Sequence, residues 1–396
     1  MDRIELLSPA GDLERLKVTL LYGADAVYIG GEKYSLRANA DNFSIEDMRE
    51  GCSFAHKLGK RVHLTLNIVF HNEDMDEVEE YISQAVDAGI DAFIVSDPFI
   101  ISYIKKKFPK IEVHLSTQNS TSNYKAVQYF EREGVNRVVL ARELSKWQIK
   151  EIVKKTHTDI EVFIHGAMCA CFSGRCALSN YVTNRDANRG GCAQVCRFAF
   201  ENPSNKDFTM ALKDMNMAEY IKDLIEIGVT SLKVEGRMRS LYYLATVIGT
   251  YREIIDSYYD NNLTDDKMKV FQERLERVSN RENSTHYFMK EADYTDQYYT
   301  GRGEKSNQDY LGQVISYDGQ FLKFYERNYF EVGDLIEVFT PGGCHISFVV
   351  EKLYNSLKEI VDVARHPDEI YYLEYFSDCI IPEYSMIKIV KRRREL

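Results

Sequence analysis

The N-terminal two thirds of this chain repeat one pattern, in which a short run of β-branched and apolar residues precedes a stretch with helical spacing of apolar residues. The helical spacing is clear at Met48, Cys52 and Ala55. The predicted strands are Ile4–Ser8, Ala26–Gly30, Val62–Asn67, Ala92–Ser96, Ile111–Ser116, Arg137–Ala141, Ile160–His165 and Ser231–Glu235. Such a repeat within about 250 residues is typical of a parallel (β/α)8 barrel of the TIM type, in the α/β class. A doubly wound open sheet is the alternative, although the chain lacks the glycine fingerprint of such sheets.

The pattern changes near Thr264, where the repeat of strand and helix stops. Lys267–Ser279 is predicted to be a helix because its apolar residues fall on one face. A polar, tyrosine-rich connector follows, and after it come short alternating strands separated by turn residues. These strands are predicted at Leu311–Tyr317, Phe321–Tyr325, Leu335–Thr340, Ile346–Tyr354 and Met386–Val390. We therefore expect a barrel over residues 1–263, a helix and connector over 264–307, and a small all-β barrel domain over 308–396.

Charge and hydropathy narrow the classes of partner. The formal net charge is −11, which argues against a protein that wraps DNA through a basic surface but leaves room for a local basic patch. No apolar run approaches the roughly 20 residues that a membrane-spanning helix needs. The sequence begins MDRIELLSPAGD, without the apolar core of a secretion signal. We expect a cytoplasmic protein that binds neither membrane nor DNA.

Five of the eight cysteines lie between Cys169 and Cys196, in a glycine-rich segment that follows the seventh predicted strand. Cys169, Cys176, Cys192 and Cys196 have the spacing C-x6-C-x15-C-x3-C, and the short spacings at both ends let two pairs of sulfurs meet at one centre. Four thiolates suit a [4Fe–4S] cluster or a tetrahedral zinc ion. A reducing cytosol disfavours disulfides, and the spacing departs from the C-x2-C pairs usual in zinc ribbons. The segment is therefore predicted to bind an iron–sulfur cluster, with zinc as the alternative.

The remaining cysteines are predicted to be structural. Cys171 lies two residues from Cys169, so that binding of both to one cluster would be strained, and it is expected to be a small buried apolar residue. Cys52, Cys344 and Cys379 are isolated in the sequence and are expected to be buried in the same way.

Polar residues end several of the predicted strands, at the mouth where barrel enzymes place their chemistry. His165, Lys233 and Glu235 are candidates for catalytic roles because imidazole, amine and carboxyl groups transfer protons. The amides of Asn67 and Gln118 are candidates for substrate binding at the same mouth. Their joint placement beside the cysteine segment favours an active site over five unrelated structural residues.

Specific motifs accompany these residues and cover nearly the whole chain. The main one runs from Glu161-Val-Phe-Ile-His-Gly-Ala-Met-Cys169 into Phe172-Ser-Gly-Arg-Cys-Ala-Leu-Ser179. The others are Leu7-Ser-Pro-Ala-Gly11, Ala26-Val-Tyr-Ile-Gly-Gly31, Tyr34–Phe43, Ser116-Thr-Gln118 and Leu232-Lys-Val-Glu-Gly-Arg237. In these motifs the chain resembles the collagenase-like peptidase family of unknown catalytic type.

The resemblance implies two different activities. The family carries a historical peptidase label, but its better-understood relatives hydroxylate RNA or quinone precursors and hold an iron–sulfur cluster on four cysteines. By its cysteine order and its added β domain, this chain is similar to the branch that makes 5-hydroxyuridine at the wobble position of tRNA, using prephenate rather than oxygen. The implied partners are therefore tRNA and prephenate. A collagenase-like peptidase and a zinc-stabilised, non-catalytic RNA-binding scaffold remain alternatives.

The resemblance also extends the set of substrate-binding candidates. Arg37, Arg175 and Arg237 lie in the matching motifs and are expected to bind phosphates or the carboxylates of prephenate by bidentate pairing. Asn39 lies in the same motif as Arg37 and is a further candidate.

Overall fold

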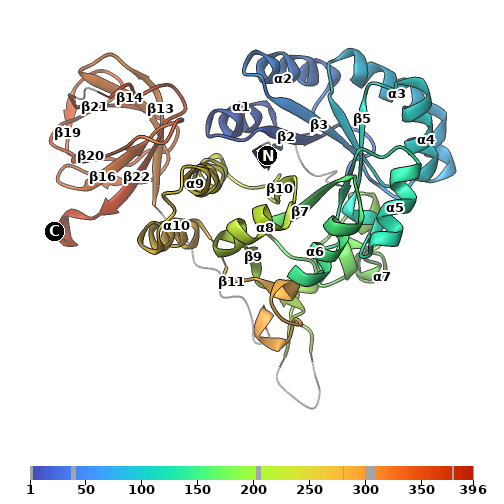
Figure 1. Cartoon of the computed structure of the whole chain (residues 1–396). Coiled ribbons are helices and arrows are strands. Elements are labelled where there is room, and N and C mark those ends of the chain that lie inside the picture. Colours follow the sequence, from blue (N-terminus) through green and yellow to red (C-terminus); the bar gives the residue numbers. More distant parts are fainter. Residues whose placement is uncertain are drawn as a thin grey trace.

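The computed structural model describes residues 3–36, 42–201, 207–279, 281–298, 309–376 and 379–395. Its N-terminal part is a closed barrel of parallel strands (Figure 1). The barrel strands are β1 (Glu5–Pro9), β2 (Ala26–Gly30), β3 (Arg61–Leu66), β4 (Ala92–Val95), β5 (Glu112–Leu115), β6 (Arg137–Val139), β7 (Asp159–Gly166) and β10 (Ser231–Val234). Strands β1 to β7 pair in chain order, and β10 pairs with both β7 and β1, which closes the barrel. The predicted (β/α)8 fold is confirmed.

Helices surround the barrel on its outer side (Figure 1). They are α1 (Leu13–Leu21), α2 (Ile45–Lys57), α3 (Met75–Asp87), α4 (Pro98–Lys107), α5 (Tyr124–Arg132), α6 (Lys146–Lys155), α8 (Ile221–Ile227) and α9 (Leu241–Tyr259). Two begin at serines whose hydroxyls accept backbone N–H groups, from Asp47 to Ser44 at 3.1 Å and from Gln148 to Ser145 at 3.4 Å. These hydroxyls satisfy amides that the first turn leaves without an intrahelical acceptor, and so fix where the helices start.

Two short strands, β9 (Asp214–Asn216) and β11 (Asn283–Ser284), extend the barrel sheet beside β7. Two others, β8 (Ala211–Leu212) and β12 (Gln297–Tyr298), form a separate two-stranded sheet. Strand β9 pairs with β7 and β11, and β12 pairs with β8. The predicted helix Lys267–Ser279 is observed as α10 (Asp265–Val278). The connector after it returns to the barrel part, where β11 pairs with β9 and β12 pairs with β8. Strands of two or three residues are too short to show the alternation of apolar and polar residues that predicts a strand. They form because the fold brings them beside a partner strand.

The C-terminal domain is an antiparallel β structure, and the all-β prediction for it is confirmed. Its strands are β13 (Tyr310–Tyr317), β14 (Phe321–Glu326), β15 (Phe330–Glu331), β16 (Leu335–Phe339), β17 (His345–Val349), β18 (Leu353–Tyr354), β19 (Ile360–Val361), β20 (Val363–Ala364), β21 (Ile370–Glu374) and β22 (Met386–Lys391). The main sheet has the order β17-β16-β22-β13-β14-β21-β18-β19. The predicted single strand Ile346–Tyr354 is wrong, because β17 pairs with β16 whereas β18 pairs with β21.

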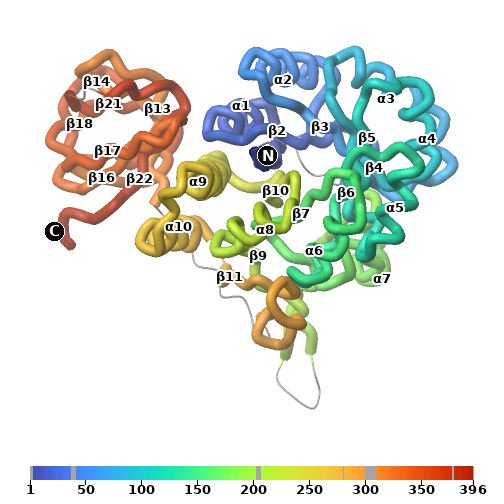
Figure 2. Tube along the Cα trace, viewed as in Figure 1, coloured from blue at the N-terminus to red at the C-terminus, as the bar shows by residue number. Residues whose placement is uncertain are grey.

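The β domain packs against α1, α9 and α10 of the barrel part (Figure 2). The hydroxyl of Tyr22, directly after α1, lies 3.0 Å from the carbonyl oxygens of Phe339 and Tyr384. The rings of Tyr242 and Tyr310 stack with their centroids 4.9 Å apart. Aromatic contacts and a buried hydroxyl thus join the two parts. Over the described residues, no helix has both the length and the apolar character needed to cross a membrane.

Candidate active site at the mouth of the barrel

A cavity of about 670 Å³ lies at the carboxyl ends of the barrel strands. Its inner wall is made by side chains of six strands, namely Tyr28, Thr65, Ile94, Val139, Phe163 and Lys233. Its outer wall is the cysteine loop, residues 167–197, which follows β7 as predicted. Because TIM-type barrels carry their active sites at this end, the cavity is the candidate active site.

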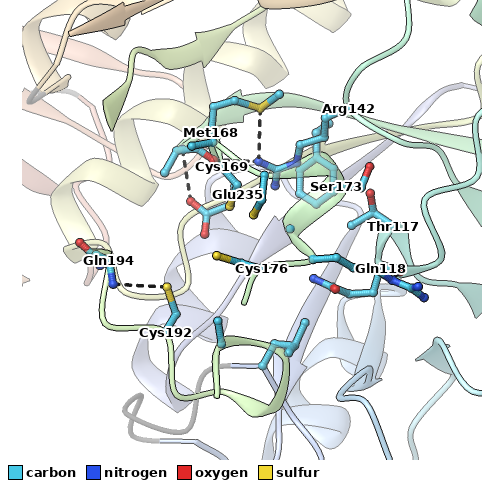
Figure 3. Close-up of a pocket in the computed structure, with 18 of the residues that line it drawn as sticks. Thr117, Gln118, Arg142, Met168, Cys169, Ser173, Cys176, Cys192, Gln194 and Glu235 are labelled. Atoms are coloured by element: carbon cyan, nitrogen blue, oxygen red, sulfur yellow. Dashed lines mark hydrogen bonds between the residues drawn. The ribbon is translucent and has the colours of Figure 1, made fainter. Parts of the chain in front are cut away.

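All five cysteines of the cysteine loop line this cavity: Cys169, Cys171, Cys176, Cys192 and Cys196. All five are free thiols. The sulfur atoms of Cys169, Cys176 and Cys192 face the same open space (Figure 3). The loop thus places thiols that are up to 27 positions apart in the sequence along the wall of one cavity, and their convergence on a single cluster stays a prediction.

Backbone amides point at two of these sulfurs. The N–H of Leu178 donates to Sγ of Cys176 at 3.3 Å. The N–H of Gln194 donates to Sγ of Cys192 at 3.4 Å, and this second bond is drawn as a dashed line in Figure 3. Such donors stabilise negative charge on sulfur, and metal-bound cysteines are thiolates. The chemistry of these donors, thiols that accept backbone N–H groups, therefore suits a metal–sulfur group, whereas the spacing of the described thiols does not form a ligand set. Within the described residues, no three His, Cys, Asp or Glu side chains are arranged to hold a metal ion.

Cys171 differs from its prediction. It is half-buried at the cavity wall, and hydrogen bonding with Cys169, burial and the nearby Cys176 raise the pKa of its thiol. The expectation of a buried apolar residue is wrong, because the loop turns between Cys169 and Cys176 and keeps the intervening thiol with its neighbours. Burial also raises the pKa of the Cys196 thiol, against the opposing charge of Arg197.

The isolated cysteines also depart in part from expectation. Cys52 is buried, as predicted. Cys344 and Cys379 are not buried, and their Sγ atoms lie 3.5 Å apart in the β domain. The two residues are 35 positions apart in the sequence, so their pairing depends on how the β domain folds and could not be predicted from the sequence.

Polar contacts with other loops, and one pair of contacts within the loop itself, hold the cysteine loop in place. The carboxylate of Glu143 accepts both the N–H and the hydroxyl of Ser173, each at 2.6 Å. Ser173 has a left-handed φ of 46°, a strained value for this residue that the two charged hydrogen bonds stabilise. The amide of Asn188 bonds the backbone of Cys176 through its oxygen at 3.0 Å and its nitrogen at 2.9 Å. Arg189 forms an ion pair with Asp74, before α3. The thiols are thus held on a fixed scaffold.

The cavity wall is strongly basic. Its charged members are seven cations, Arg142, Arg175, Arg197, Lys233, Arg237, Arg239 and Arg281, and two acids, Glu143 and Glu235. The whole chain has the opposite balance, with a net charge of −11. A cluster of guanidinium groups in a concave site favours phosphates and carboxylates, which they bind bidentately.

Most of the predicted substrate residues line the cavity: Asn67, Gln118, Arg175 and Arg237. Nε of Arg175 donates to the carbonyl oxygen of Gln118 at 2.5 Å. The Asn67 amide nitrogen is 3.5 Å from the hydroxyl of Ser116, and its Oδ1 is buried without a hydrogen-bond partner among the described residues. The predicted residues Arg37 and Asn39 lie outside the described residues.

Arg237 is held rigidly at the wall of the cavity. Its Nη1 donates to the hydroxyl of Ser35 and its Nη2 to Oδ1 of Asn42, both at 2.7 Å. A Cβ at Gly30 would collide with this guanidinium, so the glycine at the end of β2 makes room for it. Because the Arg237 side chain is already held in place, it would lose little conformational freedom when an anionic ligand binds in the cavity.

The three catalytic candidates are placed differently. Glu235 lines the cavity and its Oε2 accepts the N–H of Ala167 at 3.3 Å. Lys233 also lines it, although the amine is buried and paired with Glu161 at 2.9 Å. Burial lowers the pKa of Lys233, and Glu161 opposes that effect.

His165 is not among the residues that line the cavity. Its Nδ1 lies 3.1 Å from the hydroxyl of Tyr251 on α9. Burial, and then the charge of Arg239, lower its pKa to about 3, so the ring is neutral. This position suits a packing role and gives no geometric support to His165 as the acid or base of a reaction in the cavity.

Three basic residues of the wall were not predicted: Arg197, Arg239 and Arg281. Arg142 directly follows the predicted strand Arg137–Ala141 and is one of the polar strand ends expected at the mouth. It stacks over the ring of Phe163, with Cζ 3.7 Å from its centroid. Arg239 and Arg281 share the carboxylate of Asp214, at 2.7 and 3.0 Å. No sequence signal points to Arg281, because the pairing of β11 with β9 brings it to the barrel.

Fold and cavity together define a TIM-type barrel with a thiol-lined, basic mouth, and comparison with known proteins gives its family. Residues 11–298 match the model of peptidase family U32, and residues 306–388 match that of the peptidase family U32 C-terminal domain. The chain belongs to peptidase family U32, as its motifs indicated.

Three relatives cover nearly the whole chain. The tRNA hydroxylation protein P1 of Bacillus subtilis is 43% identical, over 92% of this chain and 90% of the relative. The tRNA hydroxylation protein P of Escherichia coli is 31% identical, over 92% of each chain. A protein of Porphyromonas gingivalis named collagenase is 32% identical, over 91% of this chain and 92% of the relative. The family therefore includes relatives with RNA-modifying and peptidase names.

Proposed function

We propose that this protein is an RNA-hydroxylating enzyme that converts the uridine at the wobble position of tRNA to 5-hydroxyuridine. The observation that carries the proposal is the basic, thiol-lined cavity in a chain 43% identical, along nearly its full length, to a relative named tRNA hydroxylation protein P1. The E. coli relative, which is named tRNA hydroxylation protein P and matches over 92% of each chain, supports the same activity.

The charge of the cavity suits an RNA substrate and a small organic acid. Arg175 and Arg237 approach the cavity from the cysteine loop and from the end of β10, so that anionic groups can be bound on two sides. The proposed co-substrate, prephenate, carries two carboxylates that guanidinium groups bind well. A wobble base is largely unpaired, so its entry into a pocket costs little base-pairing energy.

The amides in the cavity suit the edge of a uracil ring. Oδ1 of Asn67 is a buried acceptor without a partner among the described residues, and the N3–H of uracil is a donor. The side chain of Gln118 lies on the same wall and offers an N–H group for a uracil carbonyl. A buried unpaired acceptor costs about 1–3 kcal/mol, which a matching donor on the substrate would recover.

The proposed cofactor is a [4Fe–4S] cluster held by Cys169, Cys176, Cys192 and Cys196, with zinc as the alternative. When bound, the cluster would supply redox or Lewis-acid chemistry at the cavity wall. The backbone N–H groups that point at Cys176 and Cys192 stabilise the thiolate form of these ligands in either case. Glu143 keeps the loop in position through Ser173.

Nucleoside analysis tests the activity. The gene would be expressed in a strain without 5-hydroxyuridine in its tRNA, and digested tRNA would be examined by mass spectrometry. We expect 5-hydroxyuridine with the natural chain and its loss with Cys192→Ser. Cys379→Ser is the matched control, because this thiol is exposed and lies away from the cavity. If tRNA from the strain that expresses the natural chain contains no 5-hydroxyuridine, the proposal is contradicted.

Metal analysis of protein purified without oxygen tests the cofactor separately. About four iron and four sulfide ions per chain are expected for the cluster, and one zinc ion per chain for the alternative scaffold.

Peptidase activity is the second candidate, because the P. gingivalis relative is named collagenase. Incubation of the same anaerobic protein with gelatin tests it. Cleavage that disappears in the Cys192→Ser variant, together with unmodified tRNA, would favour the peptidase over the hydroxylase.

A further inference from the structure

The short helix α7 (Leu178–Thr183) of the cysteine loop exposes an aromatic ring. Tyr181 is 88% exposed, more than any other large hydrophobic side chain in the described residues. An exposed ring loses the favourable burial that most aromatic side chains achieve. Its position on a loop that already forms the cavity wall suggests a ligand that covers it.

Helix α7 connects the cavity to the outer surface. Leu178 lines the cavity, and Tyr181 lies three residues later, on the neighbouring side of the helix. Ser179 is buried, and its hydroxyl accepts the N–H of Ala193 from the second half of the loop at 3.2 Å. Tyr181 is therefore carried on an anchored helix rather than on a free chain end.

Other exposed groups on the same loop have a matching character. Phe172 is 54% exposed and lies between Cys171 and Ser173, which both line the cavity. Arg185 is exposed two residues beyond the end of α7, and Arg175 lies exposed on the cavity wall. Exposed aromatic rings interleaved with arginines are the combination with which proteins bind unpaired nucleotides, by stacking on bases and pairing with phosphates.

We propose that the outer surface of the cysteine loop, formed by Phe172, Tyr181 and Arg185, binds the unpaired nucleotides next to the target base. Tyr181 and Phe172 stack on bases, and Arg185 contacts a backbone phosphate. This surface rests on the proposed function, and it adds to that function a binding site outside the cavity.

Binding of a labelled RNA stem-loop with a uridine in its loop tests the surface. The full chain, kept without oxygen, would be titrated into the RNA and followed by fluorescence anisotropy. Loss of one stacking ring is expected to weaken binding at least about fivefold in Tyr181→Ala. Tyr181→Phe keeps the ring and is expected to stay within about twofold. Tyr129→Ala removes a half-exposed tyrosine from α5, on the outer ring of helices, and should bind as the natural chain does.

Salt dependence tests the phosphate contact. Arg185→Gln is expected to lower the slope of log affinity against log salt by about 0.7, as for one phosphate of a single strand. An unchanged slope would remove Arg185 from the surface.

The outcomes separate this surface from the proposed function. If the natural chain binds the stem-loop and Tyr181→Ala binds equally well, the surface is wrong while the activity stands. If the natural chain binds no RNA, both are wrong. If Tyr181→Ala loses binding of gelatin peptides but not of RNA, the occupant is a peptide and the RNA surface is overturned.

Discussion

The barrel and the β domain each bury a glutamate, and the two behave in opposite ways. In the barrel, burial acts to raise the pKa of Glu161, but the charges of Lys233 and Arg137 outweigh it and hold the pKa at about 2. In the β domain, burial raises the pKa of Glu326 to about 7, and Asp368 adds to the effect. Burial acts to raise the pKa of both carboxyl groups, so the charged groups beside each one decide whether its pKa lies below or above the ordinary value.

The architecture explains which glutamate has partners. Neighbouring parallel strands bring their inward side chains to similar heights, so Arg137 of β6, Glu161 of β7 and Lys233 of β10 meet inside the barrel. Glu326 stands at the end of β14, and both of its carboxyl oxygens are buried without a hydrogen-bond partner among the described residues. A closed barrel can satisfy a buried charge from several strands, whereas the end of an antiparallel strand offers few neighbours.

Glu161→Gln should have the largest effect, because it leaves Lys233 and Arg137 buried with less compensation. We expect a loss of about 3–5 kcal/mol in the free energy of unfolding, measured by urea titration at pH 7. Glu151→Gln, which breaks the exposed pair with Lys155 on α6, should cost less than about 0.5 kcal/mol. Equal losses in the two variants would mean that the charged layer contributes no more than a surface pair.

Glu326→Gln should act in the opposite direction. The folded chain holds a proton on Glu326 up to a pKa of about 7, whereas the ordinary value is 4.5, so stability falls as pH rises between these values. At pH 8 the variant should therefore be more stable by up to about 3 kcal/mol, and at pH 4 it should match the natural chain. Thermal unfolding at both pH values measures the difference. Glu351→Gln, an exposed acid of the same domain, should change neither.

His345 links the two regions, and its variant should have a smaller effect. Burial acts to lower its pKa, but hydrogen bonds with Glu253 of α9 and with Glu337 raise it, while Arg274 opposes them. A raised folded pKa gives stability below the ordinary value of 6.5 that is lost as pH rises through the folded pKa. His345→Gln should therefore cost about 1 kcal/mol at pH 6 and nothing at pH 9. A loss of the same size at both pH values would assign His345 a packing role alone.

The smallest effect is expected from the thiols of the β domain. Because Cys344 and Cys379 are 3.5 Å apart and not buried, diamide should oxidise them to a disulfide as it is itself reduced to the hydrazine. A linked peptide in a non-reducing digest measures this, and Cys344→Ser should abolish it. Under reducing conditions the same variant should change the unfolding free energy by less than about 0.5 kcal/mol. Absence of the linked peptide in the natural chain would contradict the pairing.

The sequence predicts the barrel well because buried parallel strands are continuous β-branched runs. It predicts the β domain less well. Strand β21 (Ile370–Glu374) alternates Tyr371 and Leu373 with half-buried residues, but the sequence does not predict it, because its pairing with β14 and β18 decides its state. The prediction of one strand over Ile346–Tyr354 is wrong, since a change of pairing partner leaves no mark on residue type.

The structure likewise brings some of the predicted site residues to the cavity and not others. Residues at strand ends, such as Asn67 and Gln118, reach the cavity because strand direction fixes where the mouth is. His165 does not, because the register of β7 and β10 shifts next to it and its ring packs against Tyr251 of α9. A shift of this kind depends on two distant strands, and the sequence of either one does not reveal it.

The charged layer of Arg137, Glu161 and Lys233 also determines from which side ligands can enter the cavity. These side chains fill the axis of the barrel below the cavity, so ligands reach it from the mouth. A polymer seated over that mouth would cover the route of any small reactant. For the proposed reaction the organic acid would therefore have to enter first and its product leave last, which is a compulsory order of binding imposed by the filled axis.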